Sequence, residues 1–205
     1  MSEPQAQATS IEFVFPDVLH WTIRDERIGH HPSEAYGIKT SGGVVCIDPV
    51  SLRPETTIGK VTAVVLTHRN HQRSAWSFRK RHACPVYVPE GASGLDESPD
   101  ETYGENTVLP GNLQALASRG FQHSAYLLYQ SETGKTVAFV SDLIFQDPKT
   151  GYRFPVQPGY FDPSGGIEDA RRLIEAGVDC LAPGHGSPIL EKADQVLEQA
   201  IRRIQ

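Results

Sequence analysis

Four apolar stretches of the sequence are each followed by a histidine or an aspartate. VVCI is followed by Asp48, VTAVVLT by His68, VAFVS by Asp142 and VDCLAPG by His185. One such residue needs no function, because both residue types are ordinary choices where a strand ends and the next element is capped. Four can converge on one ion if the strand ends meet at the same sheet edge, and imidazole with carboxylate suits Zn²⁺, Fe or Mn.

A polar cluster surrounds the first of these histidines. The segment THRNHQR, residues 67–73, contains two arginines, Arg69 and Arg73, beside the histidines. Guanidinium groups bind phosphate and carboxylate well, so both arginines are candidate residues for binding an anionic substrate. Arg79, Lys80 and Arg81 follow on a predicted helix and are interpreted as its solvated face.

The elements that must position these residues are mostly short strands. Short apolar runs separated by turn signals predict strands over residues 12–15, 36–39, 44–47, 61–66, 86–88, 113–117, 126–130, 137–140 and 178–181. Helices are predicted over residues 73–82, 167–176 and 191–204, and an exposed acidic loop over residues 94–106. This mixture favours an α+β fold in which two β-sheets pack face to face with helices outside.

Length and composition narrow the class of protein. A chain of 205 residues is expected to form one domain over residues 1–205, and no linker composition suggests a second. The net charge of -6 argues against nucleic acid or an anionic membrane as a partner. No apolar run approaches a membrane span, and no signal peptide is evident, so a cytoplasmic location is expected. The three cysteines are expected to be buried and reduced.

Three segments carry a resemblance to a known family. LTHRNHQRSAWSFRKRHACPVYVPEG, VAFVSDLIF and AGVDCLAPGHGSPI, in this order and spacing, resemble the metallo-β-lactamase fold superfamily over nearly the whole chain. The resemblance implies a four-layer αββα sandwich. It also implies a site at which T-H-x-H-x-D-H, a later histidine, an aspartate and a PGHG histidine hold two metal ions.

The ligand motif departs from the family pattern at several positions. Asn70 stands where the second histidine belongs, Gln72 where the aspartate belongs and Arg73 where the last histidine belongs. The later family histidine has its nearest equivalent at Gly120, and His123 is displaced from it by three residues. Two complete ion sites are therefore not expected. The Arg73 guanidinium is a candidate to occupy the second ion's position with fixed positive charge.

One ion or none is the expectation for this chain. By the resemblance, His68, Asp142 and His185 are the ligands of a single Zn, Fe or Mn ion, and Asp48 supports them through hydrogen bonds. Two further histidines remain open. His71 is either a ligand in place of Asn70 or a solvated or capping residue. The fifth metal candidate, His123, is either a ligand or a strand residue bonded to backbone.

Two functions follow from these expectations. The first is a metal-dependent hydrolase with His68 and Asp142 as catalytic residues, in which an activated water attacks an ester, thioester, amide or phosphoester. The second is a binding or scaffold protein of the same fold with a degenerate metal site, which holds a small anionic ligand. The intact PGHG and Asp142 favour the enzyme, whereas Gln72 favours the scaffold. Neither the substrate nor the oligomeric state can be predicted.

Overall fold

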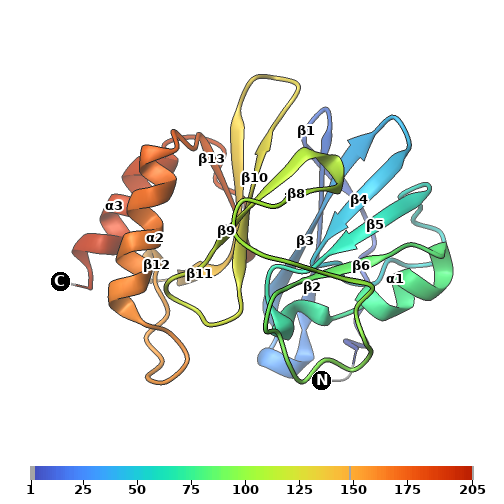
Figure 1. Cartoon of the computed structure of the whole chain (residues 1–205), viewed down its shortest axis with the longest axis horizontal. Coiled ribbons are helices and arrows are strands. Elements are labelled where there is room, and N and C mark those ends of the chain that lie inside the picture. The colour runs from blue at the N-terminus through green and yellow to red at the C-terminus, as the bar shows by residue number, and fades with distance from the viewer. Residues whose placement is uncertain (1–2, 148, 205) are drawn as a thin grey trace.

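Two β-sheets pack face to face in the computed structural model, which describes residues 3–147 and 149–204 (Figure 1). The first sheet contains, in spatial order, β1 (Glu12–Phe15), β2 (Val18–Asp25), β3 (His31–Thr40), β4 (Gly43–Ile47), β5 (Val61–Val65), β6 (Val86–Pro89) and β7 (Glu101–Tyr103). The second contains β12 (Gly151–Arg153), β11 (Thr136–Asp147), β10 (Ala125–Gln130), β9 (Leu113–Ala117) and β8 (Val108–Leu109), and β13 (Cys180–His185) pairs with β11.

Helices cover the two outer faces of this pair of sheets. Helix α1 (Ala75–His82) lies on the first sheet, while α2 (Pro163–Glu175) and α3 (Ala193–Arg202) lie side by side on the second (Figure 1). Three short 3-10 helices, η1 (Glu26–Ile28), η2 (Arg69–Gln72) and η3 (Pro110–Asn112), interrupt the connections. The predicted four-layer αββα sandwich is confirmed. No helix in the described part of the chain is long and apolar enough to cross a membrane.

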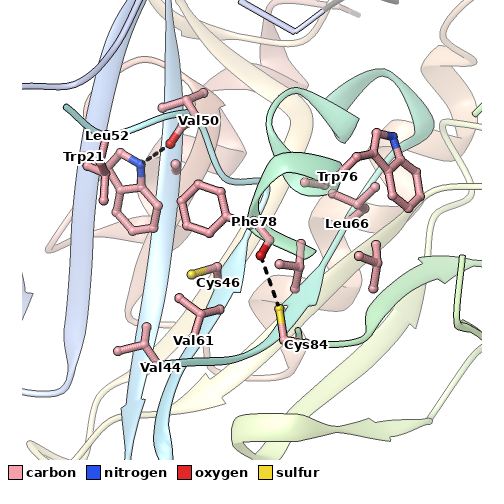
Figure 2. Packing of buried hydrophobic residues seen from close by; sticks show 14 of the residues in the cluster. Trp21, Val44, Cys46, Val50, Leu52, Val61, Leu66, Trp76, Phe78 and Cys84 are labelled. Carbon is pink, nitrogen blue, oxygen red and sulfur yellow. Dashed lines mark hydrogen bonds between the residues drawn. The ribbon is translucent and has the colours of Figure 1, made fainter. Parts of the chain in front are cut away.

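Three hydrophobic clusters separate the four layers. One lies between α1 and the first sheet and includes both tryptophans; in it the Trp21 indole N–H donates to the Val50 carbonyl at 2.8 Å (Figure 2). The second fills the space between the sheets, and the third lies between the second sheet and helices α2 and α3. Alternate residues of β4 supply the first two clusters, because successive strand side chains point to opposite faces.

The sequence-based elements agree with the structure except at a few places. Each of the nine predicted strands and three predicted helices overlaps an observed one, and the three cysteines are buried and free, as expected. The predicted loop over residues 94–106 was wrong in part, since it contains β7. The prediction that a strand ends just before Asp142 was also wrong, because β11 continues to Asp147. Strands β2, β8 and β12 were not predicted.

Candidate metal site

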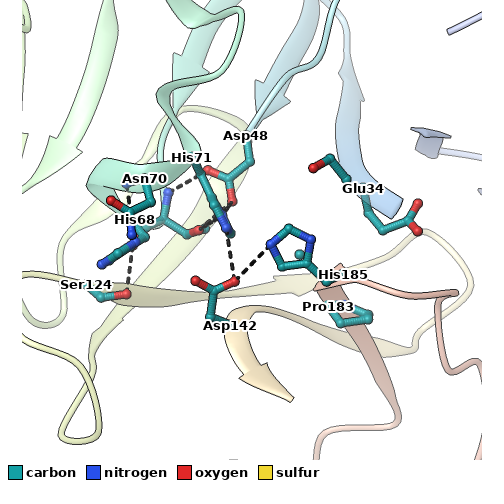
Figure 3. A network of polar contacts seen from close by, with 12 residues as sticks. Glu34, Asp48, His68, Asn70, His71, Ser124, Asp142, Pro183 and His185 are labelled. Atoms are coloured by element: carbon teal, nitrogen blue, oxygen red, sulfur yellow. Dashed lines mark hydrogen bonds and ion pairs between the residues drawn. The ribbon is translucent and has the colours of Figure 1, made fainter. Parts of the chain in front are cut away.

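The turn that follows β5 directs its two histidines to different places. His68 precedes η2, and its Nδ1 accepts a hydrogen bond from the Asn70 backbone N–H at 3.3 Å. The tight 3-10 turn then directs His71 towards the second sheet, where its Nε2 lies 3.1 Å from Asp142 Oδ1 (Figure 3). His71 is 2% exposed. The turn therefore buries the second histidine of THRNHQR at the sheet junction.

Asp48 orients this buried imidazole. It follows β4 with a φ of +47°, a backbone conformation that is uncommon for a residue with a side chain. Its Oδ1 accepts from the Thr67 backbone N–H at 2.8 Å, and its Oδ2 accepts from the Thr67 hydroxyl and from His71 Nδ1 at 2.8 Å. A carboxylate can only accept, so His71 Nδ1 carries the proton and Nε2 is turned towards Asp142.

Asp142 enters the site through an irregularity in the middle of β11. The pairing of β11 with β13 shifts register on both sides of Ser141, whose φ is +49°. A bulge of this kind redirects the neighbouring side chain without ending the strand. Oδ1 of Asp142 faces His71 Nε2, and it also lies 3.4 Å from His185 Nε2. The carboxylate is thus shared by two imidazoles.

His185 is the last residue of β13, at the end of the PGHG segment. Its Nδ1 lies 2.7 Å from the Pro32 carbonyl oxygen, which can only accept, so this nitrogen also carries the proton. The preceding residue must be small. A Cβ on Gly184 would lie 2.6 Å from His71 Cε1, closer than real contacts allow. Glycine at this position therefore lets β13 approach the imidazole of His71.

These groups form a donor set that fits a divalent cation. One ligand atom from each of His71, Asp142 and His185 lies within 4.8 Å of the other two, and no other such group occurs among the described residues. Both imidazoles donate Nδ1–H to an oxygen and turn Nε2 to the same carboxylate oxygen. Metal-ligating histidines typically donate the other ring N–H to an oxygen in this way, which fixes the tautomer with Nε2 as the ligand atom.

The protonation states of these groups also favour a bound cation. Burial disfavours ionisation of Asp142, but His71, His185 and His68 outweigh it and hold the pKa of this carboxyl well below its ordinary value. Burial lowers the pKa of His185 to about 4, so its Nε2 is a bare lone pair at neutral pH. A lone pair that faces a carboxylate oxygen is unfavourable unless a proton or a cation lies between the two acceptors.

Arg73 lies beneath this group rather than at its surface. Its Nη1 donates to the carbonyls of Glu34 and Asp48, and its Nη2 donates to the Gly184 carbonyl at 3.1 Å. The residue is 2% exposed, so its guanidinium is not open to a substrate. Its φ of +30° is strained for a residue with a side chain, and such strain persists only where the surroundings impose it.

A tyrosine that sequence reasoning missed closes the other side of Asp142. The Tyr160 hydroxyl donates to Asp142 Oδ2 at 2.6 Å and accepts from Asn70 Nδ2 at 3.3 Å. Burial and Asp142 raise the pKa of Tyr160, so it remains a donor. Tyr160 follows Asp142 by eighteen positions in a segment rich in proline and glycine, and nothing in that spacing indicates the contact.

His68 lies beside this group and not within it. Its ring meets those of His71 and Tyr160 edge to face, with centroids 6.0 Å and 5.9 Å away, and it also contacts Phe121. Burial lowers the pKa of His68 to about 4, so the imidazole is neutral. Because Nδ1 accepts from Asn70, the proton of the neutral ring is on Nε2.

The remaining candidates lie outside the ligand group. His123 is exposed, and its Nδ1 contacts the Glu90 carbonyl at 3.2 Å. Gln72 turns away and accepts from the Trp76 indole and the Asp96 backbone N–H. Arg69 is exposed at the edge of a pocket of about 740 Å³ that His68 and Tyr160 also line.

The structure of this chain was compared with solved protein structures, and its sequence with known protein families. Neither a protein-family model nor a curated protein matches the sequence. The DIM-1 metallo-β-lactamase, studied after exposure to ceftazidime, superposes with a TM-score of 0.74 at 14% identity over 100% of both chains. A metallo-β-lactamase from Pontibacter korlensis superposes with a TM-score of 0.73 at 17% identity, over 96% of this chain and 98% of that one.

This chain has the metallo-β-lactamase fold. The FIM-1 enzyme from Pseudomonas aeruginosa, in a mono-zinc form, also superposes, with a TM-score of 0.70 at 12% identity over 100% of this chain and 98% of that one. Within the metallo-β-lactamase fold, this chain has His71, Asp142 and His185 as one potential ligand group, while the hydrogen-bonded chain of Asn70, Tyr160 and Asp142 lies beside His68.

Proposed function

We propose that the protein is a hydrolase that uses one divalent metal ion, held by His71 Nε2, Asp142 Oδ1 and His185 Nε2. The observation that carries the proposal is the convergence of two Nε2 atoms on one carboxylate oxygen, with each Nδ1 bonded to an oxygen acceptor. Three protein ligands of these types are the usual set of a catalytic zinc site. Zn, Fe or Mn in this position would supply the Lewis acidity that activates water at neutral pH.

The chain's own residues would then perform three tasks. Asp48 and the Pro32 carbonyl fix the orientation of the two imidazoles. Tyr160 holds Asp142 so that only one carboxylate oxygen is turned to the imidazoles. His68 lines the neighbouring pocket, and its Nε2–H can donate to an oxygen of an ester, thioester, amide or phosphoester as negative charge develops there.

A second candidate function is binding without catalysis. It is favoured by Tyr160, whose hydroxyl is bonded both to Asp142 and to the asparagine that replaces a family ligand. It is also favoured by His71, because a proton on its Nε2 would satisfy the contact with Asp142 Oδ1 without a metal ion. Under this alternative the group is a buried hydrogen-bond network, and the protein holds its ligand in the adjoining pocket.

Metal analysis separates the two functions. Protein purified without chelator, then incubated with Zn²⁺, Fe²⁺ or Mn²⁺ and dialysed, is expected to retain about one equivalent of metal. His71→Ala and His185→Ala should each lose it, whereas His123→Ala, a matched change at an exposed histidine, should retain it. Hydrolysis of aryl ester and phosphoester probes should follow metal content. Wild-type protein that retains no metal under any of these conditions would refute the hydrolase.

A further inference from the structure

The lining of the pocket beside the ligand group includes three aromatic residues, Phe121, Tyr160 and Phe161, and three prolines. Two runs of the chain, residues 119–123 and 155–163, line it together with His68 and Arg69, and the three aromatic residues belong to these runs. The rings pack closely, with centroids 5.2 Å apart for Phe121 and Tyr160 and 4.9 Å apart for Phe121 and Phe161. Its volume of about 740 Å³ lies within the range of small-molecule sites.

Two guanidinium groups lie on the rim of this apolar space. Arg69 is exposed, and no hydrogen bond or ion pair to it is found among the described residues. The guanidinium of Arg119 lies at a loose 3.7 Å from the exposed carboxylate of Glu168. The lining contains one carboxylate, Asp162, which caps α2 by accepting from the Ser164 N–H at 3.0 Å. The rim is therefore net positive and keeps one arginine available.

We propose that this pocket binds an amphipathic anion. An apolar body, alkyl or aryl, packs against Phe121 and Tyr160, and a carboxylate or phosphate group pairs with Arg69. A small inorganic anion would leave the aromatic wall exposed to water, and a neutral apolar molecule would leave the guanidinium unpaired. Val156 on the rim is 75% exposed, and an alkyl chain in the pocket would cover it.

The substrate class follows from the walls that the pocket shares with the ligand group. His68 and Tyr160 line the pocket, and Tyr160 bonds Asp142. A molecule in the pocket thus has one end beside the proposed metal site. This step rests on the proposed function: the substrate would be an ester or thioester whose apolar body carries an oxyanion. Binding itself requires no metal.

Calorimetry on chelator-treated protein tests the pocket independently of the metal site. Octanoate and octyl phosphate should bind, while octanol and acetate, which each lack one half of the amphiphile, should bind at least about tenfold more weakly. Arg69→Gln should weaken octanoate binding about tenfold, the size expected for one charge-assisted hydrogen bond. Arg24→Gln removes an exposed arginine on β2, away from the pocket, and should have no effect.

A second variant protects the test against an indirect effect of Arg69→Gln. Val156→Glu places a negative charge on the rim, at an exposed position, and should also weaken octanoate binding. Octanoate that fails to bind, or that binds both arginine variants equally well, would overturn the proposal. Wild-type protein that binds octanoate but no metal would refute the proposed hydrolase and would still support the proposed binding pocket. The tighter of the two octyl ligands identifies the head group.

Discussion

At the scale of single residues, one oxygen atom has an unusual environment. Asp142 Oδ1 lies 3.1 Å from His71 Nε2 and 3.4 Å from His185 Nε2, and its carboxyl group is ionised in the fold. Burial lowers the pKa of His185 to about 4, so its Nε2 carries no proton to donate to Asp142. Burial and Arg73 lower the pKa of His71, but Asp142 and Asp48 outweigh them and raise it above 6.5. A proton on His71 therefore competes with a metal ion.

This competition predicts that metal affinity depends on pH. Because the pKa of His71 is raised, the imidazole is protonated below that pKa, and the proton must leave before Nε2 can bind metal. Apparent Zn²⁺ affinity should fall as the pH decreases from about 8.5 to 5.5, by up to about tenfold per unit once His71 is protonated. Titration against a chromophoric chelator measures this. An affinity that is constant across the range would contradict the assignment of His71 as a ligand.

Removal of the Tyr160 hydroxyl should loosen the metal site. Tyr160→Phe keeps the ring that packs on His68 but frees Asp142 Oδ2, so the carboxylate can rotate away from the imidazoles. Loss of such a supporting hydrogen bond typically weakens metal binding by about 10–100-fold. Titration with Co²⁺, followed by its visible absorption, reports both affinity and coordination. Tyr87→Phe, a partly buried tyrosine on β6, is the control, and an identical titration for both variants would contradict the prediction.

The candidate site could be predicted from sequence only in part. Asp142 and His185 follow apolar runs, and that pattern indicates them directly. His71 stayed open, because whether it or Asn70 points inward is decided by the tight turn of η2, and the motif spacing does not fix that turn. Tyr160 was missed because its contact is made by a long connection whose path depends on the packing of α2.

At the scale of elements, Arg73 ties separate parts of the fold together. Its guanidinium donates to carbonyls from β3, from the residue after β4 and from β13, which belongs to the second sheet. It also lies near the buried carboxylates of Asp48 and Asp142 and helps to keep the pKa of Asp48 low, although burial of Asp48 acts against this. The sequence indicated a cation at this place in the motif, and the structure shows that its donors are used by the backbone.

Truncation of Arg73 should therefore destabilise the fold itself. Arg73→Ala leaves three buried carbonyls and two buried carboxylates without their cation, and such losses cost about 3–5 kcal/mol in the free energy of unfolding. Arg73→Lys keeps the charge but not the fork of donors, so its loss should be smaller. Urea denaturation measures both. Arg79→Ala, at a partly exposed ion pair on α1, should cost under about 1 kcal/mol. If Arg73→Ala lowered the free energy of unfolding no more than Arg79→Ala does, this role of Arg73 in the fold would be disproved.

The strands missed by sequence reasoning have physical explanations. Strand β2 includes buried polar residues that obscure its apolar pattern, such as His20, which pairs with Glu34 at 2.7 Å. Strand β7 exposes two of its three residues and buries only Tyr103. Its conformation is fixed by pairing with β6, which local propensity does not reveal. The predicted strands are those whose apolar residues form a short run in the sequence.

At the scale of the whole molecule, the three hydrophobic clusters lie at different depths of the sandwich, and the tryptophans report on only one of them. Both tryptophans, Trp21 and Trp76, lie in the cluster between α1 and the first sheet. Leu197 of α3 is fully buried in the cluster between the second sheet and helices α2 and α3. The two sheets and the contacts of Arg73 lie between them. A change at one face is detected at the other only if the four layers unfold together.

The linkage between layers can be measured with one core variant. Leu197→Ala opens a cavity beneath α3 and should lower the free energy of unfolding by about 2–5 kcal/mol. If the layers unfold as one unit, the tryptophan fluorescence and far-UV circular dichroism transitions should shift to lower urea by the same amount. A fluorescence midpoint equal to that of wild type, with a shifted dichroism signal, would show that the two halves of the sandwich unfold separately.

The three proposed ligand atoms come from both sheets, and this links metal binding to the stability of the fold. His71 follows β5 of the first sheet, whereas Asp142 and His185 belong to β11 and β13 of the second. An ion held by all three would cross-link the two sheets and add about 2.7 kcal/mol at a free metal concentration one hundred times its dissociation constant. The melting temperature of the protein would then depend on the supply of metal around it, and metal depletion would lower it.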